Sequence, residues 1–131
     1  MIVDWAGKYV GLDYRLGSVG PKYFDCWGLV VWVYKQEFKL TINEGIFYMT
    51  KEDRAILLRE HIGKWLKIIK PQPGDGILFM IGGKIPHCGI YVGESKMLHS
   101  VDRRMSCIEN INSPKWKSRL EGYYRYSPGT S

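Results

Sequence analysis

The sequence lacks any apolar stretch that approaches the roughly 20 residues of a membrane-spanning helix. Its first residues, MIVDWAGKYVG, also lack the basic start and the apolar centre of a secretory signal peptide. We therefore expect no membrane span and no export signal. Internal repeats, linkers and low-complexity segments are absent as well, so the length of 131 residues predicts a single domain over residues 1–131.

The cysteines are too few and too far apart to form a disulfide framework. Cys26, Cys88 and Cys107 are an odd number at wide spacing, and no C-x-x-C pair occurs that would suggest a zinc site. A chain of this length with 45% hydrophobic residues can form a core without a metal or a disulfide. We therefore expect neither a metal nor another cofactor.

The net charge is basic, but the basic residues are not concentrated in any segment. Lys and Arg number 19 against 13 Asp and Glu, which gives a formal charge of +6. No long run of like charges and no basic tail occurs. Nucleic-acid binding needs a clustered basic face, so we do not expect it, although a mild preference for anionic partners such as cell-wall polymer remains.

The first half of the sequence predicts helices. Asp4 could cap a short N-terminal helix, and residues 11–23 are rich in Gly and read as a loop. The apolar residues at 29–34 recur with helical spacing after Cys26, although their β-branched side chains leave a buried strand as the alternative. Residues 50–69 have amphipathic spacing and predict the clearest helix of the chain.

From Asp75 onward the sequence predicts strands. Gly82-Gly83 and Gly93-Glu94 are typical of tight turns, which would make neighbouring strands antiparallel. The predicted strands cover residues 76–81, 86–92, 96–101, 106–111 and 123–126. Helices followed by an antiparallel sheet indicate an α+β fold.

Cys26 is the cysteine whose predicted position could activate its thiol. It begins the helix that follows the Gly-rich loop, and the dipole and free amides of a helix N-terminus stabilise a thiolate. A small buried apolar residue is the alternative interpretation of Cys26. We interpret Cys88 as a core residue, and Cys107 as structural or free and without a histidine neighbour.

A reactive thiol also needs a base within hydrogen-bond reach, and two histidines are predicted to lie close together. His87 and His99 are on consecutive strands joined by a tight turn, so one imidazole could orient the other. Gly89 shares a face with His87 and leaves room for another group to approach. His61 is predicted on the solvated face of the second helix.

Three segments of the sequence resemble the NlpC family of cell-wall cysteine peptidases. They are FDCWGLV around Cys26, QPGDGILF around Asp75, and HCGIYVGESKMLHS from His87 to Ser100. The stretch YRLG at 14–17 is also similar, with Leu where an aromatic residue is common. The resemblance runs through the whole chain. It implies a reduced papain-like fold with N-terminal helices packed on an antiparallel β-sheet.

The resemblance implies a role for each matching residue. Cys26 would be the nucleophile, His87 the general base and acid, and His99 the residue that orients His87. Tyr14 would lie near the oxyanion position. Asp25 would shape the substrate pocket or hold the loop before the nucleophile.

Trp27 is the main departure from the family. Cell-wall recycling members usually have Ser at this position, where it helps bind the amino end of the stem peptide, and Trp27 would fill or reshape that pocket. The implied reaction is hydrolysis of the bond between γ-D-glutamate and the diamino acid of peptidoglycan stem peptides. Amidase or acyltransferase chemistry on the same scaffold is an alternative, but such relatives usually have Asn, Asp or Glu in place of His99.

Three segments together resemble the branch of the family found in tailed-phage tail-tip and tail-assembly proteins. They are DCWGLV, HCGIYVG and the closing segment, in which Trp116, Leu120 and Gly122–Tyr126 carry the likeness. It implies a domain made in the bacterial cytoplasm and delivered by the virion tail, with peptidoglycan peptide and tail-tip proteins as partners. The alternative is a structural tail protein with little or no hydrolase activity, docked through its aromatic surface.

Overall fold

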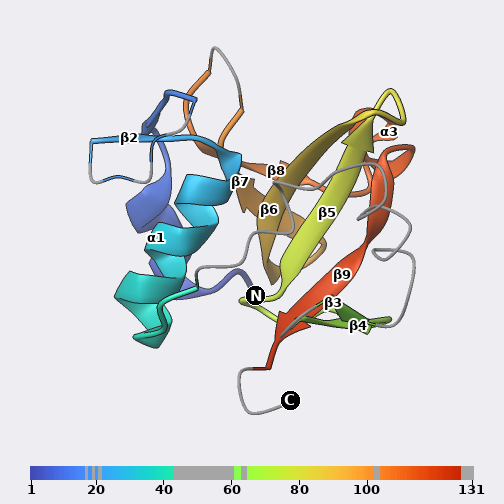
Figure 1. Cartoon of the computed structure of the whole chain (residues 1–131), viewed down its shortest axis with the longest axis horizontal. Coiled ribbons are helices and arrows are strands. Elements are labelled where there is room, and N and C mark those ends of the chain that lie inside the picture. Colours follow the sequence, from blue (N-terminus) through green and yellow to red (C-terminus); the bar gives the residue numbers. More distant parts are fainter. Residues whose placement is uncertain are drawn as a thin grey trace.

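The computed structural model describes residues 1–16, 18, 20, 22–42, 61–62, 65–101 and 104–127 (Figure 1). In this part of the chain the helices are the 3-10 helix η1 (Asp4–Tyr9), α1 (Cys26–Phe38) and α3 (Pro114–Lys117). The strands are β1 (Asp13–Tyr14), β2 (Tyr23–Phe24), β3 (His61–Ile62), β4 (Trp65–Ile68), β5 (Gly76–Ile81), β6 (Ile85–Gly93), β7 (Lys96–His99), β8 (Cys107–Asn110) and β9 (Leu120–Tyr126). Among these residues, no helix is both long and apolar enough to cross a membrane.

The larger sheet is antiparallel throughout, and its strand order is β3-β4-β9-β5-β6-β7-β8. The last strand, β9, lies between β4 and β5 and pairs with both. β1 and β2 form a separate parallel pair that leads directly into α1. Figure 1 shows α1 alongside the sheet, and its contacts are chiefly with β6. The predicted α+β fold is confirmed.

Two tight turns set the register of β5, β6 and β7. Gly82 and Gly83 have φ values of 60° and 68°, a left-handed pair that glycine adopts at little cost, in the turn that the Lys84 N–H closes on the carbonyl of Ile81. Glu94 and Ser95 take the same conformation, with φ values of 52° and 57°, between β6 and β7. Both predicted hairpins are therefore present. The second turn is centred on 94–95, one residue later than predicted.

A hydrophobic core fills the space between α1 and the sheet. The helix contributes Leu29, Val30 and Val33, which pack in one cluster with Ile90 of β6 and Leu98 of β7. These three side chains of α1 are at least 99% buried. Their burial against the sheet explains why a segment rich in β-branched residues still folds as a helix.

A smaller cluster covers the other face of the sheet. Side chains alternate along β5, so Leu78 packs in the core under α1 while its neighbours Ile77 and Phe79 point the opposite way. The short helix α3, which the sequence analysis did not predict, covers this face with Trp116. The members of this second cluster are Ile77, Phe79, Met97, Ile111 and Trp116.

The predicted helix over residues 50–69 is wrong where the structure describes it. His61 lies in β3, and Trp65–Ile68 form β4, which pairs with β9 from Trp65↔Tyr126 onward. Pairing with a strand distant in sequence therefore overrides the local amphipathic spacing. Residues 50–60, 63 and 64, and the side chain of His61, lie outside the described residues.

The predicted cap at Asp4 is also wrong, although the short helix itself is present. Val3 is the N-cap residue of η1 and makes no side-chain cap bond, while Asp4 lies in the first turn. An acidic residue in the first turn still interacts favourably with the helix dipole. Within the predicted loop 11–23, β1 and β2 add a short paired segment.

We predict that Trp65→Ala lowers the free energy of unfolding by about 3–5 kcal/mol, because the side chain is 1% exposed and its loss leaves a large cavity. The ring packs against Trp27, Tyr34 and Tyr126, with centroid distances of 6.0, 5.7 and 5.1 Å. Urea denaturation measures this difference.

The matched control is Ile69→Ala, one residue beyond β4, where the side chain is 91% exposed. We expect its unfolding free energy to change by no more than about 0.5 kcal/mol. Equal effects of the two variants would contradict the placement of Trp65 in the core.

Candidate active site

Cys26 is the first residue of α1, and the residue before it fixes the start of the helix. Asp25 is fully buried, and its Oδ1 accepts the backbone N–H of Gly28 at 2.6 Å. This N-cap bond holds Cys26 in the first helical turn, where the helix dipole favours a negative charge. Cys26 itself is 3% exposed. The structure thus places the thiol where a thiolate is stabilised.

The Cys26 sulfur is hydrogen-bonded to two consecutive residues of β6. The side chains of His87 and Cys88 both bond to it, and the backbone N–H of Cys88 donates to it as well. Burial alone would raise the pKa of the Cys26 thiol. The bonds from Cys88 and His87, together with the charge of His87, outweigh burial and lower this pKa to about 6. The thiolate therefore predominates at neutral pH.

The pKa of Cys88 moves in the opposite direction. Burial raises it well above its ordinary value, and the hydrogen bond and charge of Cys26 raise it further. Cys88 therefore keeps its proton and acts as the donor toward Cys26. A fixed donor beside the sulfur stabilises the charged form of Cys26.

The end of the pairing between β6 and β7 explains how both residues reach the same sulfur. The pairing of these strands covers Ile90↔Leu98 to Gly93↔Lys96, so His87 and Cys88 pair with β5 on one side but lie beyond the part of β6 that pairs with β7. His87 faces the cluster around Trp116, and Cys88 faces α1. The start of α1 meets the strand at this open edge, where the Cys88 amide can donate to Cys26.

The two strand histidines are in contact, as the sequence analysis predicted. The Nε2 atom of His87 lies 2.8 Å from the Nδ1 atom of His99, and both rings are buried. Gly89 makes this contact possible, because a β-carbon at this position would lie 3.2 Å from the β-carbon of His99. The Nδ1 atom of His87 is left for the Cys26 thiol.

Trp116 confines both imidazole rings. It stacks on His87 with ring centroids 5.2 Å apart and planes inclined at 26°. It meets His99 edge-on, at 5.0 Å and 84°. Phe79 of β5 contacts His87 at 6.0 Å. The ring of His87 is therefore bounded by aromatic side chains and by His99, and its orientation is restricted.

Glu109 of β8 lies behind His99. Its Oε1 atom is 3.3 Å from the Nε2 atom of His99, and its Oε2 atom accepts the indole N–H of Trp116 at 2.7 Å. The contact with His99 is oblique, since Nε2 makes no well-aligned hydrogen bond to any described residue. It is therefore an electrostatic contact more than a directed hydrogen bond.

The protonation of this pair follows from its surroundings. Burial lowers the pKa of His99 to about 4, although the carboxylate of Glu109 acts in the opposite direction. Burial would raise the pKa of Glu109, but hydrogen bonds from Trp116 and Cys107 and the contact with His99 lower it. At neutral pH a neutral His99 therefore lies beside an ionised Glu109.

The other residues implied by the resemblance lie around the start of α1. Tyr14 of β1 is half-buried and pairs in register with Phe24, two residues before Cys26. Trp27 is 4% exposed and packs edge-on against Trp65, which favours a role in the core over contact with a substrate.

The prediction that Cys107 has no histidine neighbour is wrong. Cys107 is a free cysteine, but it lies directly opposite His99 across β7 and β8, and its sulfur is 3.3 Å from Oε1 of Glu109. The sequence analysis also missed Glu109, the contacts of Trp116 with both histidines, and the bond from Cys88. The register of β8 could have indicated Glu109, because a residue two positions beyond Cys107 lies diagonal to His99 on the same face.

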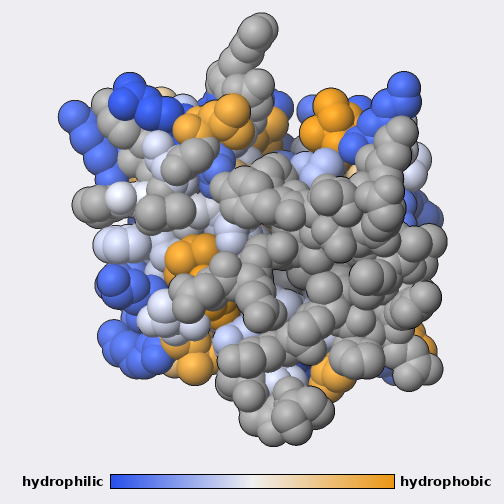
Figure 2. Space-filling view, in the orientation of Figure 1, coloured by the Kyte–Doolittle hydropathy of each residue, from blue (hydrophilic) through white to orange (hydrophobic). Residues whose placement is uncertain are grey.

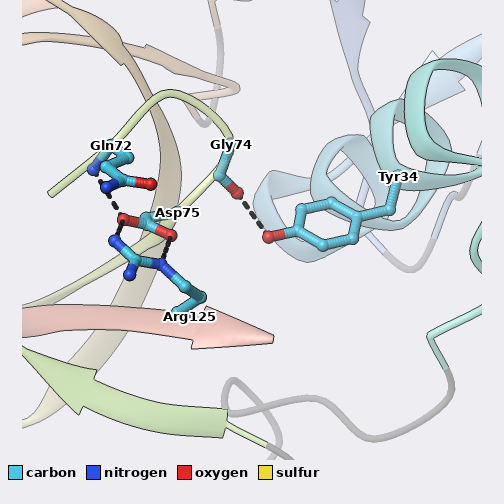
Figure 3. Close-up of polar contacts among 5 residues, drawn as sticks. All are labelled: Tyr34, Gln72, Gly74, Asp75 and Arg125. Carbon is cyan, nitrogen blue, oxygen red and sulfur yellow. Dashed lines mark hydrogen bonds and ion pairs between the residues drawn. The ribbon is translucent and has the colours of Figure 1, made fainter. Parts of the chain in front are cut away.

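The QPGD segment connects the sheet to the other end of α1 (Figure 3). Asp75 accepts the backbone N–H of Gln72 at 2.6 Å and receives two bonds of 2.9 Å from Arg125 of β9. Tyr34 of α1 donates to the carbonyl of Gly74. These bonds explain why a Gly-Asp pair stands directly before β5.

A hollow of about 240 Å³ opens beside these residues, with Tyr34, Asp75 and Arg125 in its lining. Tyr34 lies eight residues after Cys26, which is about 12 Å along the helix axis. The hollow is therefore separate from the thiol and the imidazoles. In its wall, the charges of Asp75 and Arg125 neutralise each other.

A helix that begins with a buried thiol and packs on an antiparallel sheet bearing imidazoles defines the papain-like class of α+β domain. Comparison with protein families gives a match of residues 11–125 to the NlpC/P60 family. The chain belongs to the NlpC/P60 family.

Similar relatives include two bacterial enzymes. The murein DD-endopeptidase MepS/murein LD-carboxypeptidase of Escherichia coli K12 is 29% identical over 118 residues, which cover 90% of this chain and 57% of that protein. The probable endopeptidase p60 of Listeria seeligeri is 32% identical over 127 residues, which cover 95% of this chain and 21% of p60. The chain thus spans little more than half of the first relative and about a fifth of the second.

Solved structures support the same fold. An NLP/P60 family protein of Staphylococcus aureus superimposes with a TM-score of 0.64 at 26% identity, covering 95% of this chain and 39% of that one. The NlpC/p60 domain of the peptidoglycan hydrolase SagA superimposes with a TM-score of 0.62 at 21% identity, covering 91% of this chain and 90% of that one. The reduced papain-like fold with a helix packed on an antiparallel sheet is therefore confirmed.

We predict that Cys88→Ala raises the pKa of Cys26 by about one unit, because a lost hydrogen bond costs about 1–1.5 kcal/mol. Alkylation of Cys26 by iodoacetamide, followed by peptide mass spectrometry as a function of pH, should then reach half its maximal rate at a higher pH than in the wild type.

Cys88→Ser is the control, since its hydroxyl can still donate to the sulfur. Its midpoint should stay closer to the wild-type value of about 6. Identical midpoints for the Ala and Ser variants would show that the side chain at position 88 does not stabilise the thiolate.

Proposed function

We propose that this chain is a cysteine peptidase that hydrolyses peptide bonds in peptidoglycan stem peptides. The observation that carries the proposal is the continuous line of contacts from Cys26 through His87 to His99. A nucleophile, a base within reach and a third group that orients the base are the parts that acyl transfer requires. Membership in the NlpC/P60 family and the names of the relatives support the same reaction class.

The proposed reaction passes through a thioester. The Cys26 thiolate attacks the amide carbonyl carbon, and the imidazolium of His87 gives its Nδ1 proton to the departing amine as the C–N bond breaks. A water molecule then loses a proton to His87 and attacks the thioester. The acid product leaves and Cys26 returns as the thiolate, with no net change in either residue.

Charge that develops on the carbonyl oxygen needs fixed donors. We assign the backbone N–H of Cys26, at the start of α1, as one donor, because amides at this end of a helix are not used within it. Tyr14 is the second proposed donor. Its strand is paired with β2, which leads into the nucleophile, and this position supports the assignment.

The proposed target is the bond between γ-D-glutamate and the diamino acid. The E. coli relative is named for DD-endopeptidase and LD-carboxypeptidase activity, so these two bonds are the competing targets. The buried Trp27 lies where some family members have Ser, and this difference favours a substrate whose amino end is not held as in those members.

Delivery to the wall by a phage tail is a further part of the proposal and rests on the resemblance of three segments, including the closing segment. The structure gives Trp116 and Tyr124 of that segment another role, since both are 1% exposed and lie in the core. None of the exposed large hydrophobic residues in the described part of the chain is aromatic. Figure 2 shows the hydrophobic residues on one face as separate areas. The described surface therefore does not favour a purely structural role with aromatic docking.

We predict that wild-type protein releases new muropeptides from purified peptidoglycan, and that Cys26→Ala lowers the rate by roughly 10³-fold or more. Mass spectrometry of the products identifies the bond from the new termini. A new diamino-acid amino terminus indicates the γ-D-glutamyl bond, whereas loss of a terminal D-residue indicates carboxypeptidase action.

Ile69→Ala serves as the active control, and thermal unfolding of Cys26→Ala checks that its fold is intact. Normal product release by folded Cys26→Ala would exclude Cys26 as the nucleophile. Absence of products with the wild type, together with a stable complex with a tail protein, would support the structural alternative.

A further inference from the structure

Two hydrogen-bond donors and one imidazole nitrogen converge on the carboxylate of Glu109. Oε2 accepts the indole N–H of Trp116 at 2.7 Å, and Oε1 lies 3.3 Å from both the Cys107 sulfur and Nε2 of His99. Glu109 is partly buried, whereas His99 is fully buried. A carboxylate in these surroundings offers acceptors only, so every group facing it must present a proton.

This requirement determines which nitrogen of His99 carries the proton. Neutral imidazole has one N–H, and the carboxylate of Glu109, 3.3 Å from Nε2, electrostatically favours the N–H at that nitrogen. The Nδ1 atom is then a lone-pair acceptor, and it faces Nε2 of His87 at 2.8 Å. Nε2 of His87 is then the donor to His99, and its Nδ1 atom faces the sulfur of Cys26.

We propose that Glu109 is a positioning residue that holds His99 as the Nε2–H tautomer, so that Nδ1 of His99 accepts a hydrogen bond from Nε2–H of His87. The inference rests on the proposed cysteine-peptidase function for its kinetic consequence, but not for the tautomer itself. With the opposite tautomer, His99 would present Nδ1–H toward His87. Two N–H groups would then face each other whenever His87 is protonated, and the imidazolium beside the thiolate would be disfavoured.

A metal site is the competing explanation of the same cluster. The ligand atoms of His99, Cys107 and Glu109 all lie within 4.8 Å of one another, which is close enough to surround one cation. However, the carboxylate already accepts bonds from Trp116 and Cys107. The donors present therefore account for the arrangement without a cation.

Glutamine cannot replace Glu109 in this role. Trp116 and His99 need an acceptor on each oxygen of the carboxylate, and an amide offers only one oxygen. In Glu109→Gln the amide NH₂ must therefore face either the indole N–H or the Nε2–H of His99. The conflict at His99 is relieved by moving its proton to Nδ1, which is the change that the experiment detects.

The direct test is the tautomer of His99, read from imidazole ¹⁵N chemical shifts in protein labelled at histidine. In the wild type we expect a protonated Nε2 and an unprotonated Nδ1. In Glu109→Gln we expect a substantial population protonated at Nδ1. Glu94→Gln removes the same charge at an exposed site in the turn before β7 and should leave the spectrum of His99 unchanged.

The kinetic test uses the same variants on peptidoglycan fragments. We expect Glu109→Gln to lower kcat by roughly 10- to 100-fold with little change in KM, as for other residues that orient a catalytic imidazole. The acidic limb of the pH profile should also move to higher pH. Trp116→Phe keeps a ring over His87 but removes the indole donor, so we expect a smaller loss of kcat.

Three outcomes would overturn the proposal. The first is an unchanged His99 tautomer in folded Glu109→Gln, and the second is an unchanged kcat in that variant when the wild type is active. The third is zinc binding by the wild type that is lost in Cys107→Ser and raises activity, because Glu109 would then be a ligand. A changed tautomer in a protein without peptidase activity would instead refute the proposed function alone.

Discussion

The contact between the start of α1 and the open edge of β6 is the interaction on which the rest of the structure depends. It brings the Cys26 sulfur to His87 and Cys88 and joins the helix to the sheet at one point. The cap at Asp25 sets where the helix begins. The left-handed turn at 94–95 sets the register that brings His99 beside His87. Each of these local features helps to position Cys26, His87 or His99 in one cluster.

In this cluster, charged and polar side chains lie in a row from Cys26 to Glu109, and most of them are buried. A thiolate at Cys26, the imidazole of His87, a neutral His99 and an ionised Glu109 follow one another, so two imidazole rings separate two negative groups. Buried charges are costly unless they are paired and hydrogen-bonded. Trp116 contributes an N–H to one end of this line and a ring surface to its middle.

The sequence predicted the parts of the fold that depend on short-range patterns. Alternation and turn residues gave the strands from β5 to β8, and the apolar run after Cys26 gave α1. β4 was mistaken for a helix because its pairing with β9 is not visible in local spacing. The contact of His87 with His99 was predicted because the two residues fall on consecutive strands, and the pairing of Cys26 with His87 came from the family resemblance. Glu109 and Cys88 were missed because their roles depend on side-chain contacts between elements, which periodicity does not encode.

The most direct test of the account is the ultraviolet absorbance of thiolate in the native protein at neutral pH, taken as the difference between wild type and Cys26→Ser. The lowered pKa of Cys26 predicts about one thiolate per molecule at pH 7, and a smaller thiolate signal when His87 is replaced by Ala, since the bonds from Cys88 remain. A Cys26 that ionises only near the ordinary thiol value of about 8.5, with or without His87, would contradict the account.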